Sequence, residues 1–112
     1  MRRGDVYDAR LSPTEGSEQA GVRPVIIVSR DAINRYSSVI VIVPLTRAAN
    51  IKRDYPSNVR LGEIEDGLAV DSVVLGGQVR AIAKSRLLRH RGHISTESMR
   101  QISKALRITL DL

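Results

Sequence analysis

The chain has 112 residues, no cysteine and a formal net charge of +6 at pH 7. The lack of cysteine excludes disulfides, zinc–thiolate sites and a thiol nucleophile, and the length fits one domain, 1–112, that can bury a core without staples. The opening residues, MRRGDVYDAR, lack the apolar segment of a signal peptide, and no apolar run reaches the ~18 residues of a membrane span. We therefore expect a cytoplasmic protein that does not enter a membrane.

The apolar residues are mainly β-branched: Val and Ile number 23 and Leu 10, whereas Phe and Trp are absent. Such residues suit the half-buried surface of a sheet. In chain order the patterning predicts strands over 4–11, 24–29, 38–46 and 57–61, and further strands within 67–83. Asp66-Gly67 carries a hairpin signal, and Gly76-Gly77 predicts a bulge or sharp bend.

The C-terminal residues change to the period of a helix over 96–110. Ser95 can cap this helix and Glu97 suits its first turn. One face carries apolar residues and Thr109, namely Met99, Ile102, Leu106, Thr109 and Leu110. Five to seven short strands with one C-terminal helix predict a small α+β barrel that is mostly β.

The basic residues are concentrated in the second half of the chain. Residues 72–110 contain eight Lys or Arg side chains and one acid, Glu97. A basic surface of this kind attracts RNA, DNA or an acidic protein segment. Simple solubility is the alternative interpretation, and a solvated helix face explains Arg100, Lys104 and Arg107 equally well.

Standard catalytic motifs are absent. His90 and His93, in HRGH, are three residues apart, and we expect an exposed loop there rather than an acid–base pair. The acidic cluster lacks the spacing of a calcium loop and consists of Glu63, Glu65 and Asp66. No phosphate-binding P-loop or serine elbow is present. We therefore expect neither a metal ion nor a cofactor.

Arg23 stands out because Pro24 follows it, and a proline excludes the helical region for the residue before it. Arg23 is thus expected in extended backbone where the long loop 12–23 joins the strand 24–29. A guanidinium held there can bind a phosphate through two parallel hydrogen bonds. Thr46, at the end of the strand 38–46, adds a hydroxyl donor, and the pair suits charge stabilisation at phosphorus. A structural salt bridge for Arg23 and a structural role for Thr46 remain the alternatives.

Four segments of the sequence resemble the MazF/PemK family of toxin endoribonucleases, in the same order and over nearly the whole chain. They are RGDVYDARLSPTEGSEQAGVRPVIIVS (3–29), VPLT (43–46), GLAVDSVVLGGQVRAIAKSRL (67–87), and GHIS with the following helix (92–110). The resemblance implies an SH3-like barrel of the CcdB/PemK type, usually a homodimer. It also implies a type II toxin that cleaves single-stranded RNA without metal and so inhibits translation and growth. A cognate MazE-like antitoxin with an acidic, flexible tail would cover its RNA groove.

The resemblance also assigns roles to single residues. Arg23 would be the catalytic arginine and Thr46 the catalytic threonine, whereas the RNA channel would be lined by Ser17, Glu18, Gln19, Gln78 and Arg80. The 2′-hydroxyl of RNA would attack the neighbouring phosphate, giving 2′,3′-cyclic phosphate and 5′-hydroxyl ends. Arginine stays protonated at almost any pH, so proton transfer is left open between a contribution from Glu18 and a purely electrostatic Arg23. The segments 30–37 and 47–56 match least, which leaves the cleavage sequence open.

Two other functions remain open at this stage. Gyrase inhibitors that act by binding share the same small-barrel architecture, and a fold does not fix a function. A plain nucleic-acid-binding barrel would bind RNA in a salt-sensitive way without turnover. Only Tyr7, Tyr36 and Tyr55 can stack on bases, so any RNA recognition should depend mainly on hydrogen bonds and charge.

Overall fold

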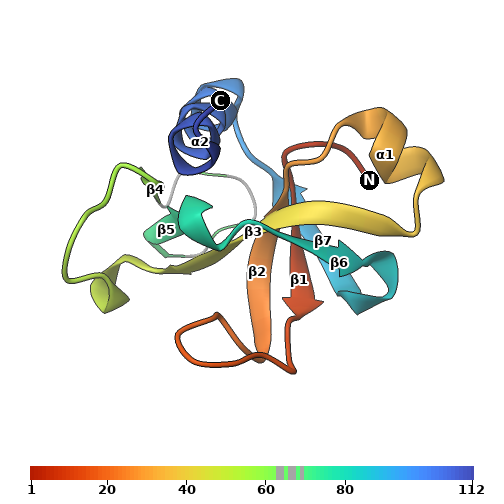
Figure 1. The fold of residues 1–112 in the computed structure, drawn as a ribbon, viewed down its shortest axis with the longest axis horizontal. Helices are drawn as coiled ribbons and strands as arrows, with labels where there is room; N and C mark the ends of the chain where they lie inside the picture. The colour runs from red at the N-terminus through yellow and green to blue at the C-terminus, as the bar shows by residue number, and fades with distance from the viewer. Residues whose placement is uncertain (63–64, 66–67, 69) are drawn as a thin grey trace.

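A computed structural model describes residues 1–62, 65, 68 and 70–112 of the chain. This described part confirms the prediction of a mostly-β fold with short strands and a C-terminal helix (Figure 1). The elements in chain order are β1 (Asp5–Arg10), β2 (Val22–Ile27), α1 (Asp31–Tyr36), β3 (Val39–Arg47), the 3₁₀ helix η1 (Ala48–Asn50), β4 (Asn58–Leu61), β5 (Ser72–Leu75), η2 (Gly76–Gln78), β6 (Arg80–Ala83), η3 (Lys84–Arg86), β7 (Leu87–His93) and α2 (Thr96–Leu110).

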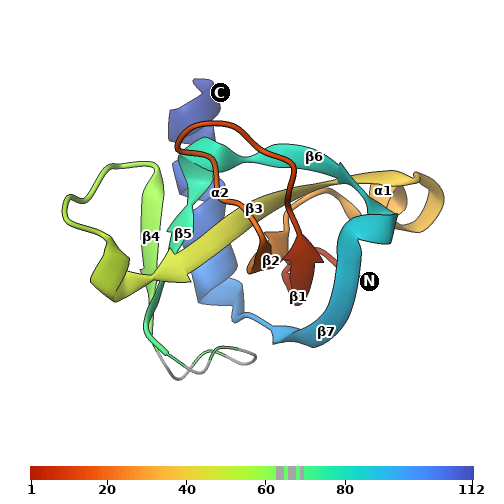
Figure 2. The ribbon, with the colours of Figure 1, turned by 90° about the horizontal axis from the view of Figure 1, so that it is seen from below.

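The strands form one antiparallel sheet in the order β4-β5-β3-β2-β1-β7, with β6 attached to β3. β3 joins the two halves of this sheet, because residues 39–44 pair with β6 and β2 whereas residues 45–47 pair with β5. Figure 2 shows β3 running across the molecule beneath the loop that joins β1 to β2. Within the described residues the ladder does not return from β7 to β4, so the sheet coils like a barrel without closing.

The continuous apolar run of β3 reflects burial on both faces. Val43 and Leu45 lie in the core that α2 covers, and Ile40 and Ile42 lie in a second core on the other side of the strand. All four side chains are at most 1% exposed. Burial of one such side chain stabilises the fold by about 1.5–3 kcal/mol. The two cores therefore hold β3 rigidly, and with it the residues at its C-terminal end.

The predicted helix α2 begins at Thr96, as expected from the cap. The Ser95 hydroxyl accepts a hydrogen bond from the Ser98 amide at 3.1 Å. Met99, Ile102 and Ala105 are buried against the sheet. Leu110, by contrast, is 52% exposed, so the prediction that it belongs to the packed face is wrong. The basic residues of α2 lie on its exposed side, as a solvated face requires, and are Arg100, Lys104 and Arg107.

One sequence-based expectation is corrected by the structure, and a second is confirmed in one of its two alternatives. Residues 87–93 form β7, paired with β1, rather than a loop around the histidines. Six of the seven residues of this edge strand are exposed or only partly buried, so its sequence lacks the apolar alternation that would predict a strand. At Gly76-Gly77 the bulge is absent, but the sharp bend that the sequence equally predicted is present, because η2 turns the chain between β5 and β6; a side chain at Gly76 would collide with the Ser57 carbonyl. The hairpin signal at Asp66-Gly67 lies outside the described residues.

Candidate functional site

A pocket opens where β2 and β3 separate. The antiparallel pairing of these strands ends at Val25 and Pro44, and Arg23 and Thr46 each lie two residues beyond this last pair. Pro44 has no N–H to donate to the ladder, and beyond it β3 pairs with β5 instead. The fork holds a pocket of about 280 Å³, lined by Val22, Arg23, Pro24, Leu45, Thr46, Arg47, Leu68, Val70, Ser72 and Arg91. The structure thus brings the two predicted catalytic residues into one pocket.

Arg23 lies within β2 and pairs with Ala9 of β1, so its backbone is extended as predicted. Its Nε donates a hydrogen bond to the Ala20 carbonyl at 3.0 Å. In the described part of the chain Arg23 forms no ion pair, and its Nη groups donate no hydrogen bond. The salt-bridge alternative therefore has no partner among the described residues. Both Nη groups are left to bind an anion.

The loop that precedes Arg23 is fixed at its base. Leu11 N donates to the Gly21 carbonyl at 2.9 Å, and Gly21 N donates to the Ser12 hydroxyl at 2.8 Å. Gly21 has a φ of 75°, a backbone conformation that glycine adopts readily. Arg86 adds a hydrogen bond from Nη1 to the Ser12 carbonyl at 2.7 Å. These contacts hold the strand end from which Arg23 projects.

Thr46 is only 8% exposed, in the wall of the pocket. Its Oγ1 accepts a hydrogen bond from Asn50 Nδ2 at 3.1 Å. Among the described residues the Thr46 hydroxyl donates to no partner. A buried hydroxyl whose proton is uncommitted is placed to donate to a bound anion.

Three polar residues at this pocket were not predicted from the sequence: two of them line it, and the third binds one of its lining residues. Arg47 and Arg91 line it, and Arg91 also pairs with Asp8 through Nη1 and Oδ1 at 3.2 Å. Asn50 binds Thr46 from η1. Arg47 and Asn50 follow Thr46 by one and four residues, so their closeness to Thr46 in the chain could have marked them as candidates. Arg91 could not, because its strand β7 carries no strand signal.

The residues predicted to line the RNA channel are also brought together, but in a different place. Gln19 N donates to Gln78 Oε1 at 2.8 Å, and Gln78 Nε2 donates to the Ser17 carbonyl at 3.4 Å. These contacts join the β1–β2 loop to η2. A pocket of about 180 Å³ there is lined by Leu11, Glu18, Gln19, Pro44, Gly77, Gln78, Val79 and Arg80. It shares no lining residue with the pocket of Arg23 and Thr46.

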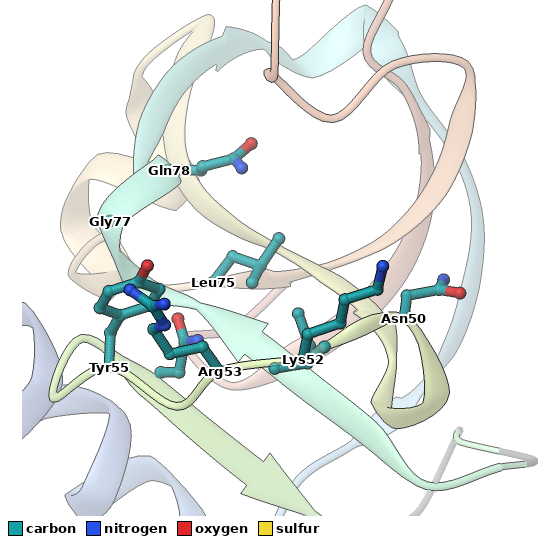
Figure 3. Close-up of a pocket in the computed structure, with 9 residues that line it drawn as sticks. Asn50, Lys52, Arg53, Tyr55, Leu75, Gly77 and Gln78 are labelled. Atoms are coloured by element: carbon teal, nitrogen blue, oxygen red, sulfur yellow. The ribbon is translucent and has the colours of Figure 1, made fainter.

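A larger pocket, of about 520 Å³, lies between the segment 50–55 and η2 (Figure 3). Its labelled residues come from η1 and the segment that follows it, from β5 and from η2, with Asn50 and Gln78 on opposite sides of the group. The complete lining consists of Asn50, Ile51, Lys52, Arg53, Tyr55, Asn58, Leu75, Gly77 and Gln78. The larger pocket shares Gly77 and Gln78 with the small one, and Asn50 in its wall donates a hydrogen bond to Thr46 in the wall of the Arg23 pocket.

The three pockets are strongly cationic. Their described lining contains six basic side chains, namely Arg23, Arg47, Lys52, Arg53, Arg80 and Arg91, and a single carboxylate, that of Glu18. Clustered cations on a concave surface raise the local concentration of a polyanion. The surface therefore suits a nucleic-acid backbone that passes from one pocket to the next.

The two histidines lie on β7 beside a buried carboxylate, outside these pockets. His93 Nδ1 lies 2.8 Å and His90 Nε2 3.6 Å from Asp5 Oδ1. Burial acts to raise the pKa of Asp5, but the hydrogen bonds from His93 and from the Arg2 amide outweigh it and lower the pKa. This arrangement ties the start of β1 to β7 and is structural.

Glu65, from the acidic cluster, binds the N-terminus of α2. Its carboxylate accepts hydrogen bonds from Ser95 N at 3.0 Å, from Ser95 Oγ at 2.9 Å and from Ser98 Oγ. Burial acts to raise the pKa of Glu65, but these hydrogen bonds outweigh it and lower the pKa. Glu65 thus has a structural role in place of metal binding, and Glu63 and Asp66 lie outside the described residues.

Over the residues that the structure describes, no group of three or more acidic or histidine side chains could hold a metal ion. The helices found there are too short or too polar to cross a membrane.

Comparison with known families identifies the chain. The model of the PemK-like, MazF-like toxin of type II toxin–antitoxin systems matches residues 2–110. The chain belongs to this family. The resemblance seen in the sequence is thereby confirmed over almost its whole length.

Relatives within the MazF-like family agree with this assignment. Endoribonuclease MazF of Staphylococcus saprophyticus is 40% identical over 112 residues, which make up 100% of this chain and 92% of the relative. The prediction that the chain is an endoribonuclease of the MazF-like toxin class is thereby confirmed.

Solved structures of MazF-like toxins share the fold. An endoribonuclease in complex with its cognate antitoxin, from mycobacterial species, is 29% identical with a TM-score of 0.83, covering 100% of this chain and 96% of that one. MazF from Deinococcus radiodurans is 24% identical with a TM-score of 0.83, covering 100% and 97%.

Proposed function

We propose that this MazF-like toxin cleaves single-stranded RNA, messenger RNA included, without a metal ion, and that Arg23 and Thr46 stabilise the transition state. One observation carries the proposal: Arg23, with its Nη groups uncommitted, and the Thr46 hydroxyl line the same pocket. In the transition state the phosphorane carries negative charge on several oxygens. The Arg23 guanidinium and the Thr46 hydroxyl can donate hydrogen bonds to different oxygens of this group and so stabilise it.

The reaction needs little from the protein beyond position and charge. The 2′-oxygen of the RNA attacks the adjacent phosphorus, the bond to the 5′-oxygen breaks, and a 2′,3′-cyclic phosphate and a 5′-hydroxyl result. Arg23 binds two non-bridging oxygens and Thr46 donates to one of them as negative charge grows. The described lining of this pocket contains no carboxylate and no imidazole. We therefore assign to solvent both the removal of the 2′-proton and the delivery of a proton to the departing 5′-oxygen, rather than to Glu18, which lines a different pocket.

RNA on either side of the cleaved bond would occupy the other two pockets. Glu18, Gln19, Gln78 and Arg80 would contact bases or backbone in the small one, and Ser17 would form its rim on the β1–β2 loop. Lys52 and Arg53 would contact phosphates in the larger one. Such contacts would let the protein recognise a short RNA sequence, mainly through hydrogen bonds to its bases.

The proposal extends to partners and compartment. The six cations of the three pockets suit an antitoxin with an acidic, flexible tail, which would inhibit the toxin by covering the RNA path. The exposed apolar residues at the C-terminal end of the chain support a homodimer, namely Ile108, Leu110 and Leu112. Inhibition of translation and growth would follow from cleavage of messenger RNA in the cytoplasm.

The test is cleavage of long single-stranded RNAs of varied sequence in excess EDTA, by the purified chain and by Arg23→Ala. We expect discrete cuts with 5′-hydroxyl ends by the wild type only, and the same melting temperature for both proteins. Arg23→Ala that cuts at the wild-type rate would overturn the catalytic assignment. RNAs that all stay intact with folded, antitoxin-free protein would overturn the nuclease function.

A further inference from the structure

We propose that Asn50 is a positioning residue for RNA cleavage, which holds the Thr46 hydroxyl so that its proton points at the phosphate. The inference rests on the proposed function, because it takes Thr46 as a donor to the transition state. It assigns a role to a residue that no sequence motif marks.

The geometry at Thr46 carries the argument. A hydroxyl has one proton and two lone pairs. Asn50 Nδ2 is 3.1 Å from Thr46 Oγ1 and is the donor, so it occupies a lone pair and leaves the proton uncommitted. The Thr46 side chain is 8% exposed and lines the pocket of Arg23. A phosphate bound by Arg23 would supply an acceptor for that proton within the same pocket.

The backbone holds Asn50 in place for this task. β3 ends at Arg47, and η1 turns the chain so that Asn50 meets the residue four positions before it. Ala48 N donates to the Asp71 carbonyl at 3.0 Å, and Ile51 N donates to the Ala48 carbonyl at 3.1 Å. The first bond ties the start of the turn to the segment before β5, and the second closes the turn on itself. Without the Asn50 amide, the Thr46 hydroxyl could rotate among several staggered directions, and only some of them face the phosphate.

A competing explanation must be separated from this one. Asn50 also lines the larger pocket, next to Lys52 in Figure 3, and could bind RNA there directly. A direct contact would act whether or not residue 46 carries a hydroxyl. A positioning role acts only through that hydroxyl.

A double-mutant cycle distinguishes the two roles. Asn50→Ala is measured in the wild type and in Thr46→Val, which keeps the shape of the side chain but lacks the hydroxyl. Single-turnover cleavage of a short RNA that contains a mapped cut site gives the rate of each protein. We expect Asn50→Ala to lower this rate about tenfold in the wild type, the cost of about one hydrogen bond. In Thr46→Val it should lower the rate less than twofold.

Three further measurements complete the test. An RNA with a 2′-deoxy residue at the cut site should bind the wild type and Asn50→Ala equally, and the melting temperatures of the two proteins should differ by no more than a few degrees, about the cost of one hydrogen bond. In Asn50→Asp the carboxylate can only accept hydrogen bonds. It should accept one from the Thr46 hydroxyl, turn that hydroxyl away from the phosphate, and lower the cleavage rate at least as much as Asn50→Ala does. Asn58→Ala is the matched control, since Asn58 lines the larger pocket without touching Thr46. Any effect of this control should be equal in both backgrounds.

Each adverse outcome has a separate meaning. An equal loss from Asn50→Ala in both backgrounds would overturn the positioning role in favour of a direct RNA contact. No loss in the wild type would overturn it as well. A Thr46→Val protein that cuts at the wild-type rate would instead refute Thr46 as a catalytic residue, and with it that part of the proposed function.

Discussion

Replacement of Arg23 by lysine tests whether the pocket needs a forked cation or only a positive charge. Arg23 Nε is held by the Ala20 carbonyl at 3.0 Å, and the two Nη groups have no partner in the described part of the chain. Lysine keeps the charge but can reproduce neither this anchor nor two parallel hydrogen bonds. One lost hydrogen bond to a charged group corresponds to about 1.5–3 kcal/mol. The rate of cleavage should therefore fall by about 10- to 160-fold.

The assay is single-turnover cleavage of an RNA with a mapped cut site, with Arg107→Lys on the exposed side of α2 as the matched control. The control should cleave at the wild-type rate. Arg23→Lys should bind the 2′-deoxy analogue within a few-fold of the wild type, because the charge is kept. A rate for Arg23→Lys equal to that of the control would refute the two-pronged contact, even if Arg23→Ala were inactive.

Three other predictions concern stability and binding. Glu65→Gln should lower the free energy of unfolding by about 1 kcal/mol, or the melting temperature by about 4 °C, because one acceptor for Ser95 and Ser98 is lost; an unchanged calorimetric midpoint would show that Glu65 does not cap α2. Because the pKa of Asp5 lies below its ordinary value of 3.8, its contribution to stability is present above that value and is lost as the pH falls through the folded pKa. Denaturant titrations from pH 7 to pH 2 should therefore show a smaller loss of stability below pH 4 in Asp5→Asn than in the wild type, and parallel curves would contradict this. Lys52→Gln should reduce the slope of log Kd against log salt concentration by about 0.7 for a single strand, and fluorescence anisotropy that finds the wild-type slope would exclude a phosphate contact there.

The sequence predicted best the elements whose own residues determine them. α2 combines a Ser95 cap with an apolar period of 3.6, and its start was predicted to the residue. β3 is buried on both faces, and its unbroken apolar run predicted a core strand. Arg23 and Thr46 could be singled out because Pro24 and the end of β3 fix their local backbone.

The sequence predicted poorly whatever depends on a distant partner. β7 is a strand because β1 pairs with it, through an irregular register that its exposed, basic residues do not reveal. An edge strand rich in charge resists pairing with other chains. The same charged residues break the apolar alternation by which a strand is predicted from sequence. Arg91 reaches the pocket of Thr46 only through this pairing. Asn50 was missed for a different reason, because its role depends on the direction of one hydroxyl proton.

The position of the catalytic pocket separates the proposed chemistry from the choice of sequence. Arg23 and Thr46 project from β2 and β3, which two buried cores hold rigid. The segment 48–56 that follows β3 supplies five of the nine residues that line the largest pocket, and the β1–β2 loop contributes Leu11, Glu18 and Gln19 to the small one. Loops tolerate substitution far better than packed strands. Changes in those loops can therefore alter which bases are recognised while Arg23 and Thr46 stay in place. A swap of the segment 48–56 between two such toxins should transfer the preference for a cleavage sequence, while the products keep their 5′-hydroxyl ends. Asn50 would have to be kept in such a swap, because it lies in the exchanged segment and acts on the chemistry.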